Sequence, residues 1–490
     1  MIRRHGVRAV LSLPCEAFVK SVAGVKHCLV GCVTIAFLLA SSVTAVAEPY
    51  RDGDVVVFFG DSITHGGRYH EYISDYYRTR FPDAQIRFVN SGIGGDTAAG
   101  ARRRIPEDVA EYSPTHVAFH FGMNDICRGS YAAVATSSDL RSRERAQQEY
   151  RRNFRGLVES VREVVPRAKF TYLTPTVYDD TAVVTNAPKT GWASVNQVGC
   201  NTGLSLMAGF VLECAAADKV EAVDWYSPLC GFLYCHQETD RHFMITNSDR
   251  VHPGKLGHSI MAWEFLKAQN VPGVVSEVEV DAAGPRSVRA VNCKVTELQC
   301  ETDGVSFVLL AKALPLPVCE EAMPYVDEFK VEETLNREIV KVTGLPMRSE
   351  FCLCIDGEEV GRYSGEQFAT GVRLGFNRKT PQYRQAQKVA ERNAELWGRE
   401  VVLRNHHSAR WFYGKRGAPV DDVGAFALWF ERNEKDKNSY FAKFVPGYLE
   451  YWPKYAKVRD ELLMDQRQTR EMALPLPHRY EIRPVADAGK

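Results

Sequence analysis

Short apolar runs alternate with longer helical patterns from Asp54 to Gln269, and this alternation restricts the possible folds more than any other feature. A repeated strand-then-helix order is typical of a parallel sheet with covering helices. It predicts an α/β fold, a three-layer α/β/α sandwich, with a ligand site outside the carboxyl ends of the strands. The predicted strands are DVVVFFG, QIRFVN, THVAFHFG, AKFTYLT and KVEAVDW, and the predicted helices cover about 69–81, 97–112, 143–165, 203–217 and 255–269.

A chain of 490 residues is longer than one ordinary hydrophobic core accommodates, so we expect more than one domain. The pattern of apolar and polar residues changes after Gly273. VSEVEVD alternates with period two, and Asp356-Gly357 stands where a hairpin turn is expected. Thr380 and Pro381 then resemble a helix cap and a first helical position. We therefore expect an α/β domain at 48–272, a small β module at 273–376 and a helical, aromatic-rich region at 377–490.

The first 47 residues carry the pattern of an export leader. Basic residues precede the apolar run from Cys28 to Ala40, and AVA at Ala45 to Ala47 supplies small residues for cleavage. The pattern predicts a signal peptide at 1–47 and export to the periplasm or the extracellular space, with an uncleaved N-terminal anchor as the alternative. No later stretch approaches the roughly 18 apolar residues of a spanning helix, so we expect no stable membrane span in the mature protein.

The charge and the cysteine content limit which binding partners and which cellular compartment we expect. The 61 basic residues balance 61 acidic ones, so no net field favours nucleic acid or an anionic membrane surface. Three of the 13 cysteines lie in the leader, and the other ten run from Cys127 to Cys354. An even number suits disulfides in an exported chain, while buried free thiols explain each cysteine equally well. The adjacent His406 and His407 give no usable metal pattern.

Ser62 stands in GDSIT, directly after the first predicted strand and at the start of a helix. The helix dipole and the free N–H groups there favour developing negative charge, which suits a nucleophile. A serine at the same place also serves as a plain helix cap, so this position alone leaves both roles open.

Residues after the later strands add to this site. NSGIGGDT brings Gly95, whose backbone can approach a ligand closely, and GMND brings the side-chain amide of Asn124. Together with Ser62 they would form an oxyanion hole, although a tight turn and a helix cap explain them as well. Asp249 and His252 lie close together in SDRVHP, so the carboxylate can hold Nδ1–H and leave Nε2 free as a base.

The blocks GDSIT, NSGIGGDT, GMND and DRVHP stand in the order found in the SGNH hydrolases, also called GDSL esterases and lipases, which the chain resembles over about 54–269. The resemblance implies a flavodoxin-like sandwich and a serine esterase that needs neither a metal nor an organic cofactor. It implies that Ser62 is the nucleophile and that His252 is the base, oriented by Asp249. The implied oxyanion hole consists of Ser62, Gly95 and Asn124.

Export and the appended β module favour an O-acetyl group on a carbohydrate as the scissile ester. The partner is then a small acyl ester or an acetylated glycan, with no nucleic acid. Two alternatives stay open: a lipase or phospholipase acting on longer acyl chains, and a non-catalytic glycan-binding protein on the same scaffold. The sequence leaves the oligomeric state open.

Several residues lie outside the four blocks. The long segment 174–230 either borders the substrate pocket or is a surface insertion. His65, Arg68, Tyr69 and Arg128 adjoin the blocks, and we expect structural roles for them. The tryptophans of the helical region are expected to pack in a core rather than to bind sugars: Trp397, Trp411, Trp429 and Trp452.

Overall fold

The structure is a computed structural model that describes residues 48–283, 287–301, 304–433 and 439–485. The predicted signal peptide at 1–47 lies outside the described residues.

Five parallel strands form the predicted sheet, in the order β2-β1-β3-β4-β5. In register, Val57 of β1 lies between Val89 of β2 and Val117 of β3. These strands are continuous apolar runs because helices cover both faces of the sheet. All five predicted strands are confirmed: β1 (Val55–Gly60), β2 (Arg87–Gly92), β3 (His116–His120), β4 (Lys169–Leu173) and β5 (Glu221–Val223).

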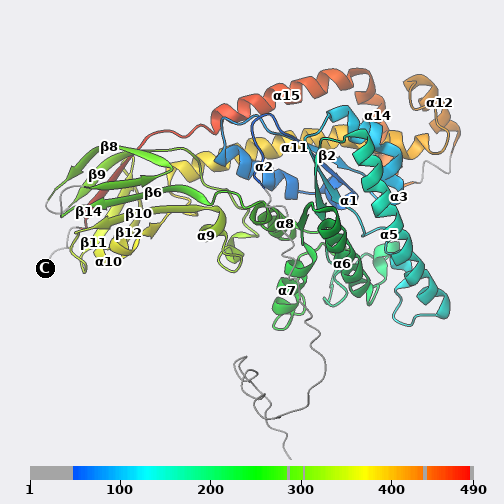
Figure 1. Ribbon diagram of the computed structural model, residues 1–490, viewed down its shortest axis with the longest axis horizontal. Coiled ribbons are helices and arrows are strands. Elements are labelled where there is room, and N and C mark those ends of the chain that lie inside the picture. Colours follow the sequence, from blue (N-terminus) through cyan, green and yellow to red (C-terminus); the bar gives the residue numbers. More distant parts are fainter. Residues whose placement is uncertain (1–47, 284–286, 302–303, 434–438, 486–490) are drawn as a thin grey trace, which may run out of the picture. The chain divides into compact units, whose positions relative to one another are not determined.

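Helices pack on both sides of this sheet, as the predicted sandwich requires (Figure 1). On one side α2 (Tyr69–Arg80) packs against α8 (Lys255–Ala268). On the other side α5 (Ser137–Val164) packs against α6 (Cys200–Asp218). The side chain of Thr136 and that of Asp139 cap the start of α5 reciprocally, which fixes where this helix begins.

Two parts of the α/β domain differ from the prediction. The expected helix at 97–112 is broken into α3 (Ala98–Ala101), η1 (Arg102–Arg104), α4 (Ile105–Asp108) and η2 (Ala110–Tyr112). Pro106 explains the break, because proline lacks the N–H that a continuous helix needs. The helix α7 (Tyr226–Gln237) was missed, because apolar residues stand on all sides of it and leave no clear polar face.

The helix α6 alters the expectation about membrane spans. Among the described helices it alone has the length and the apolar composition that could cross a membrane, contrary to the sequence-based expectation. More than half of its most apolar window is buried within the protein. That burial is what a helix covering a sheet requires, so its apolar character is explained by packing.

Two further sheets form the β module, in the orders β13-β10-β6-β7 and β12-β11-β14-β9-β8. At the predicted hairpin Asp356 has φ 52° and Gly357 has φ 83°, which is the conformation of a type I′ turn. The strands of the first sheet are β6 (Val274–Asp281), β7 (Val288–Val291), β10 (Arg337–Thr343) and β13 (Val372–Arg373). Those of the second are β8 (Cys293–Cys300), β9 (Val305–Ala311), β11 (Glu350–Ile355), β12 (Glu358–Ser364) and β14 (His478–Pro484).

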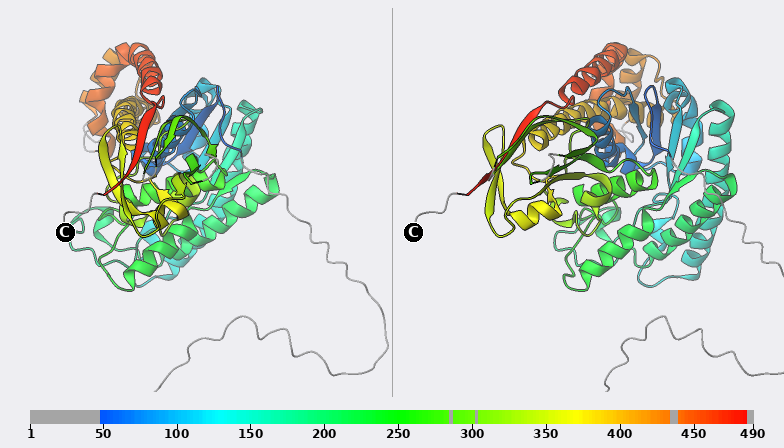
Figure 2. Two further views of the ribbon diagram at one scale, coloured as in Figure 1. Left: turned by 90° about the vertical axis from the view of Figure 1, so that its left-hand side faces the viewer. Right: turned by 60° about the vertical axis from the view of Figure 1, so that its left-hand side comes forward.

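The strand β14 comes from the far end of the chain, in the region predicted as helical. It pairs with both β9 and β11, so the C-terminal segment completes a sheet of the β module (Figure 2). Tyr480 and Ile482 are buried in the core of that module. The short helices η5 (Met323–Tyr325), α9 (Val331–Leu335) and α10 (Gly365–Thr370) lie between strands in the sequence.

The C-terminal region is helical, and its longest helix α11 (Pro381–Gly414) begins at the predicted Thr380 cap. The helix α15 (Tyr455–Met472) packs beside α11 (Figure 1). Trp397 is buried, and its indole N–H donates to Ser74 of α2 at 3.0 Å, so the core role predicted for this tryptophan is confirmed. The other elements are η3 (Arg128–Ser130), η4 (Trp192–Ser194), α12 (Val423–Arg432), η6 (Tyr440–Phe444), α14 (Val445–Tyr451) and η7 (Trp452–Lys454).

A buried ionic network joins α11 to the α/β domain. Arg404 donates to both carboxylate oxygens of Asp108, at 2.6 and 2.7 Å. Arg104 donates to the same carboxylate at 2.6 Å and to Asp96 at 2.7 Å. All four side chains are at most 3% exposed. Burial alone would raise the pKa of Asp108, but the two guanidinium groups hold it well below its ordinary value.

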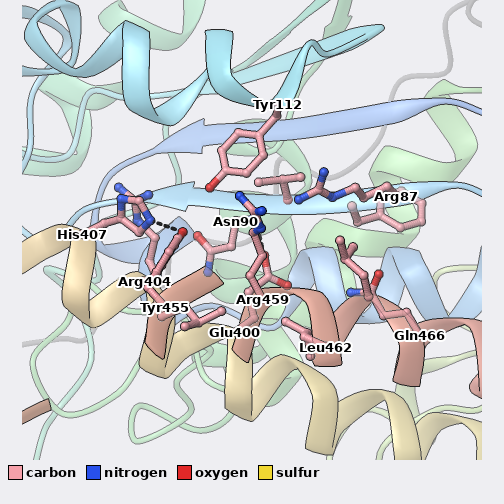
Figure 3. A pocket seen from close by; sticks show the side chains of 14 residues that line it. Arg87, Asn90, Tyr112, Glu400, Arg404, His407, Tyr455, Arg459, Leu462 and Gln466 are labelled. Carbon is pink, nitrogen blue, oxygen red and sulfur yellow. Dashed lines mark hydrogen bonds between the residues drawn. The ribbon is translucent and has the colours of Figure 1, made fainter. Parts of the chain in front are cut away.

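Figure 3 shows the same face of α11 beside β2, with Glu400, Arg404 and His407 turned toward the strand. The Asn90 N–H donates to Glu400 at 2.9 Å, and burial raises the pKa of this carboxyl to about 7. The cavity between these side chains has a volume of about 40 Å³, which is room for a water molecule rather than for a substrate.

All ten cysteines among the described residues are free thiols, so disulfides are not part of this structure. Cys352 and Cys354 lie on one face of β11, as expected for residues two apart in a strand, with their sulfur atoms 3.4 Å apart. Of the two explanations that the sequence allowed, the structure has the free thiol.

We expect the Asp108→Asn variant to lose about 3–5 kcal/mol of its free energy of unfolding, because two buried guanidinium groups would lose their shared carboxylate. Denaturant unfolding of the parent and the variant measures the difference. Asp421→Asn is the matched control, since Asp421 pairs with Arg410 at the surface and is 82% exposed. Equal losses in the two variants would contradict a special role for the buried network.

Candidate active site

The structure brings Ser62, His252 and Asp249 into one hydrogen-bonded chain. His252 Nε2 lies 2.8 Å from Ser62 Oγ, and Nδ1 lies 2.7 Å from Asp249 Oδ2. With the proton on Nδ1, the ring donates to Asp249 and Nε2 accepts from the serine hydroxyl. This arrangement lets the imidazole remove the serine proton while the carboxylate stabilises the resulting imidazolium.

The sheet and a short helix position Ser62. The strand β1 ends at Gly60, and Ser62 is the first residue of α1 (Ser62–Gly66). The cap is Asp61, whose Oδ1 accepts from the Ile63 N–H at 2.9 Å, so the capping explanation of the serine is wrong. Burial raises the pKa of Asp61 to about 6. As the first helical residue, Ser62 has an N–H that no carbonyl of its own helix can accept.

A compact turn positions His252. Asp249 Oδ1 accepts from the backbone N–H groups of Val251 and His252, at 3.0 and 2.9 Å. Asn247 N–H in turn donates to the carbonyl of His252 at 2.7 Å. Burial alone would raise the pKa of Asp249, but the hydrogen bond and charge of His252, together with the backbone N–H groups of His252 and Val251, outweigh this and leave the pKa below the ordinary value. The carboxylate is therefore ionised wherever the imidazole can act as a base.

Gly95 and Asn124 lie in loops after β2 and β3, near the same edge of the sheet. Gly95 has φ +74°, a left-handed conformation that favours glycine, and a Cβ there would meet open space. The Asn124 amide donates to the carbonyl of Asp96 at 2.9 Å, which ties the two loops together. An amide group carries two N–H donors, so the second is not used by this bond.

A pocket of about 570 Å³ opens above Ser62. Its walls include Ser62, Asp249 and His252 from the α/β domain and Trp192 from the long segment 174–230. That segment therefore borders the pocket, which the sequence had left open. Another part of the wall comes from the C-terminal region: Val401, Asn405, Tyr440, Lys443 and Phe444.

His65 connects this C-terminal wall to the loop that carries Gly95. Its Nδ1 accepts from the Gly94 N–H at 3.2 Å, so Nε2 carries the proton and donates to Asn405 Oδ1 at 2.8 Å. Burial, followed by the charge of Arg404, lowers the pKa of His65 to about 4. The ring is thus neutral at ordinary pH, and only the neutral ring can accept from Gly94.

The other residues beside the sequence blocks divide into two groups. Tyr69 is buried and lies 3.0 Å from the Thr64 hydroxyl, and Arg68 pairs with Glu71 at 3.5 Å, so both have structural contacts. Arg128 instead lies beside the site, where it donates to Asn124 Oδ1 at 3.3 Å and stacks 4.9 Å from the Trp192 ring centroid. The expected structural role of Arg128 therefore stays a prediction.

Sequence reasoning missed the pocket residues that come from outside the α/β domain. Asn405, Tyr440 and Lys443 belong to no motif, and the aromatic richness of the tail was the only signal near them. No group of three or more His, Cys, Asp or Glu side chains in the described part of the chain has the geometry to hold a metal ion.

Residues 58–260 match the model of the GDSL-like Lipase/Acylhydrolase family. This segment is a GDSL-like lipase/acylhydrolase domain. The GDSL-like domain contains Ser62, Gly95, Asn124, Asp249 and His252, and the chain is a carboxylic ester hydrolase.

Similar proteins support this assignment. An acetylxylan esterase of Geobacillus stearothermophilus is 24% identical over 247 residues, which cover 44% of this chain and 93% of that protein. The uncharacterized lipoprotein YqeF of Bacillus subtilis (strain 168) is 33% identical over 142 residues, covering 26% of this chain and 51% of that protein. The chain therefore matches about half the length of YqeF.

One solved structure resembles the chain well beyond the GDSL-like domain. It is BT4096, a gut microbial diltiazem-metabolizing enzyme, with 28% sequence identity and a TM-score of 0.79. The match covers 90% of this chain and 99% of BT4096. The β module and the C-terminal helices are therefore part of the shared architecture.

We expect a fluorophosphonate probe to label Ser62 selectively, because His252 can remove the proton of this hydroxyl alone among the serines described. Mass spectrometry after proteolysis identifies the modified residue. Labelling should be abolished in Ser62→Ala and slowed at least tenfold in His252→Ala. A modified serine elsewhere, or an unchanged rate in His252→Ala, would contradict this interpretation.

Proposed function

We propose that the protein is an exported serine esterase that removes O-acetyl groups from a carbohydrate through Ser62, His252 and Asp249. Ser62 Oγ attacks the ester carbonyl while His252 Nε2 takes its proton. The tetrahedral oxyanion accepts hydrogen bonds from the N–H groups of Ser62 and Gly95 and from the Asn124 amide. The tetrahedral intermediate then collapses, the bond from the acetyl carbon to the sugar oxygen breaks, and His252 protonates that oxygen, which leaves as the sugar hydroxyl. Water attacks the acetyl-enzyme in the same way to release acetate and restore the Ser62 hydroxyl.

The hydrogen-bonded chain from Ser62 through His252 to Asp249 carries the proposal. The same three groups would explain the hydrolysis of any small acyl ester, so the choice of a carbohydrate rests on two further observations. One is the similarity to an acetylxylan esterase. The other is that exposed aromatic rings, Trp192 and Tyr440, border the pocket, as sugar-binding sites require.

A lipase or phospholipase is less well supported. Histidine, asparagine, lysine and aromatic side chains make up most of the pocket wall, which provides no long aliphatic surface for an acyl chain. A small non-carbohydrate ester is the second candidate, because BT4096 is a diltiazem-metabolizing enzyme of the same architecture. Turnover of diltiazem beside an acetylated xylo-oligosaccharide distinguishes the two substrate classes.

Export remains part of the proposal. It is supported by the leader pattern before Glu48 and by the partial match to a lipoprotein. Amino-terminal sequencing of the protein secreted by an expressing bacterium would test it, with Glu48 as the expected first residue.

We expect the Ser62→Ala variant to hydrolyse p-nitrophenyl acetate at the background rate. The Asp249→Asn variant should lose roughly 10³- to 10⁴-fold in kcat, because the amide no longer holds the Nδ1–H tautomer or stabilises the imidazolium. Initial rates with circular dichroism as a folding control measure both effects. Parent-like activity in Ser62→Ala would remove this serine from the mechanism.

We expect Asn405→Ala to lower kcat roughly 10- to 100-fold with little change in KM, since Asn405 is a positioning residue for His65 and the Gly94–Gly95 loop. Asn405→Asp should recover much of kcat, because its carboxylate still accepts from His65 Nε2–H. A loss of the same size in both variants, or a change in KM alone, would contradict a positioning role.

A further inference from the structure

Two exposed aromatic rings flank the pocket, and a cationic side chain lies over each ring. On the side of His252, Trp192 lies 6.3 Å from the imidazole centroid and Arg128 stacks on it at 4.9 Å. On the side of Gly94, a Cβ added to the glycine would lie 3.5 Å from Cε1 of Tyr440, and Lys443 Nζ lies 3.7 Å from the centroid of that ring. Trp192 is 50% exposed and Tyr440 is 60% exposed, so both rings face solvent rather than a core.

The charges around the pocket are unbalanced. Lys443 lines the wall and has no carboxylate within ion-pair distance among the described residues. Arg128 Nη1 donates to the backbone carbonyl of Met123 and to the side-chain carbonyl of Asn124. The other guanidinium nitrogens take no part in these two bonds. Asp249 supplies the carboxylate in the described wall, and this carboxylate already accepts a hydrogen bond from His252. Neither Lys443 nor Arg128 therefore forms an ion pair with a carboxylate of the described residues.

We propose that the ester substrate is an acidic saccharide, in which sugar rings stack on Trp192 and Tyr440 while carboxylates of the sugar units pair with Arg128 and Lys443. This inference rests on the proposed function, and it names the substrate class of the same site. An aromatic face binds the apolar face of a sugar ring, and a neighbouring cation adds recognition of a carboxylate. Neutral acetylated sugars would use the rings and leave both cations unpaired.

The position of Lys443 makes it the residue to test. Arg128 contacts Asn124, so its replacement would disturb the proposed oxyanion hole. Among the described residues Lys443 donates no hydrogen bond to the proposed machinery, and its ammonium group lies over the rings of Tyr440 and Phe444 at 3.7 and 4.9 Å. Lys454 is a matched control, because it lies 5.1 Å from the Tyr451 ring in the same helical region but outside the pocket wall.

The experiment measures the binding of unesterified oligomers of galacturonic acid and of xylose, of equal length, to the parent, Lys443→Gln and Lys454→Gln by calorimetry. We expect the parent to prefer the acidic oligomer. Lys443→Gln should bind it roughly fivefold more weakly, with neutral binding unchanged and with an effect that shrinks at high salt. Lys454→Gln should bind both oligomers as the parent does.

Equal binding of the two oligomers by the parent would overturn the inference, as would an equal loss for both oligomers in Lys443→Gln. Hydrolysis of p-nitrophenyl acetate by the parent and by Lys454→Gln separates this result from the proposed function. Both proteins should hydrolyse that neutral ester alike. Charge-dependent binding without any hydrolysis would support the acidic-saccharide site and contradict the esterase.

Discussion

The bidentate pairing of Arg404 with Asp108 is the contact on which the composite site depends. It places α11 against the carboxyl end of β2, where Arg404 Nε also donates to the carbonyl of Gly92 at 2.5 Å. Arg104 extends the same network to Asp96, the residue after Gly95. Charges this deeply buried are costly to desolvate, and complete pairing offsets that cost. The network therefore fixes one position of α11 relative to the candidate oxyanion loop.

This position gives the C-terminal region a place in the chemistry. With α11 held by Arg404, the adjacent Asn405 meets His65, and His65 in turn accepts from Gly94. Further along the chain, η6 contributes aromatic and cationic side chains to the pocket wall. The proposed nucleophile, base and carboxylate come from the GDSL-like domain, as do Trp192 and Arg128, while Tyr440 and Lys443 of the proposed substrate site come from outside it. The shared architecture with BT4096 fits this division, because it includes the added regions.

The α/β domain was readable from sequence because its signals are local. Buried parallel strands are continuous apolar runs, and each proposed catalytic residue follows a strand or stands in a short motif. The contacts missed are long-range: His65 and Asn405 are 340 residues apart, and β14 pairs with strands far earlier in the chain. A single residue such as Asn405 forms no repeating pattern in the sequence, so its contact with a distant residue cannot be predicted from it. The number of cysteines alone could not decide whether disulfides form, because pairing depends on the distance and orientation of the two cysteines.

We propose that the C-terminal region forms part of the substrate site. The most direct test is a crystal structure of the Ser62→Ala variant with an acetylated oligosaccharide bound. We expect an acetyl carbonyl beside Gly95 and Asn124, with sugar rings in contact with Tyr440 as well as with Trp192. A ligand that contacts only residues before 273 would contradict it.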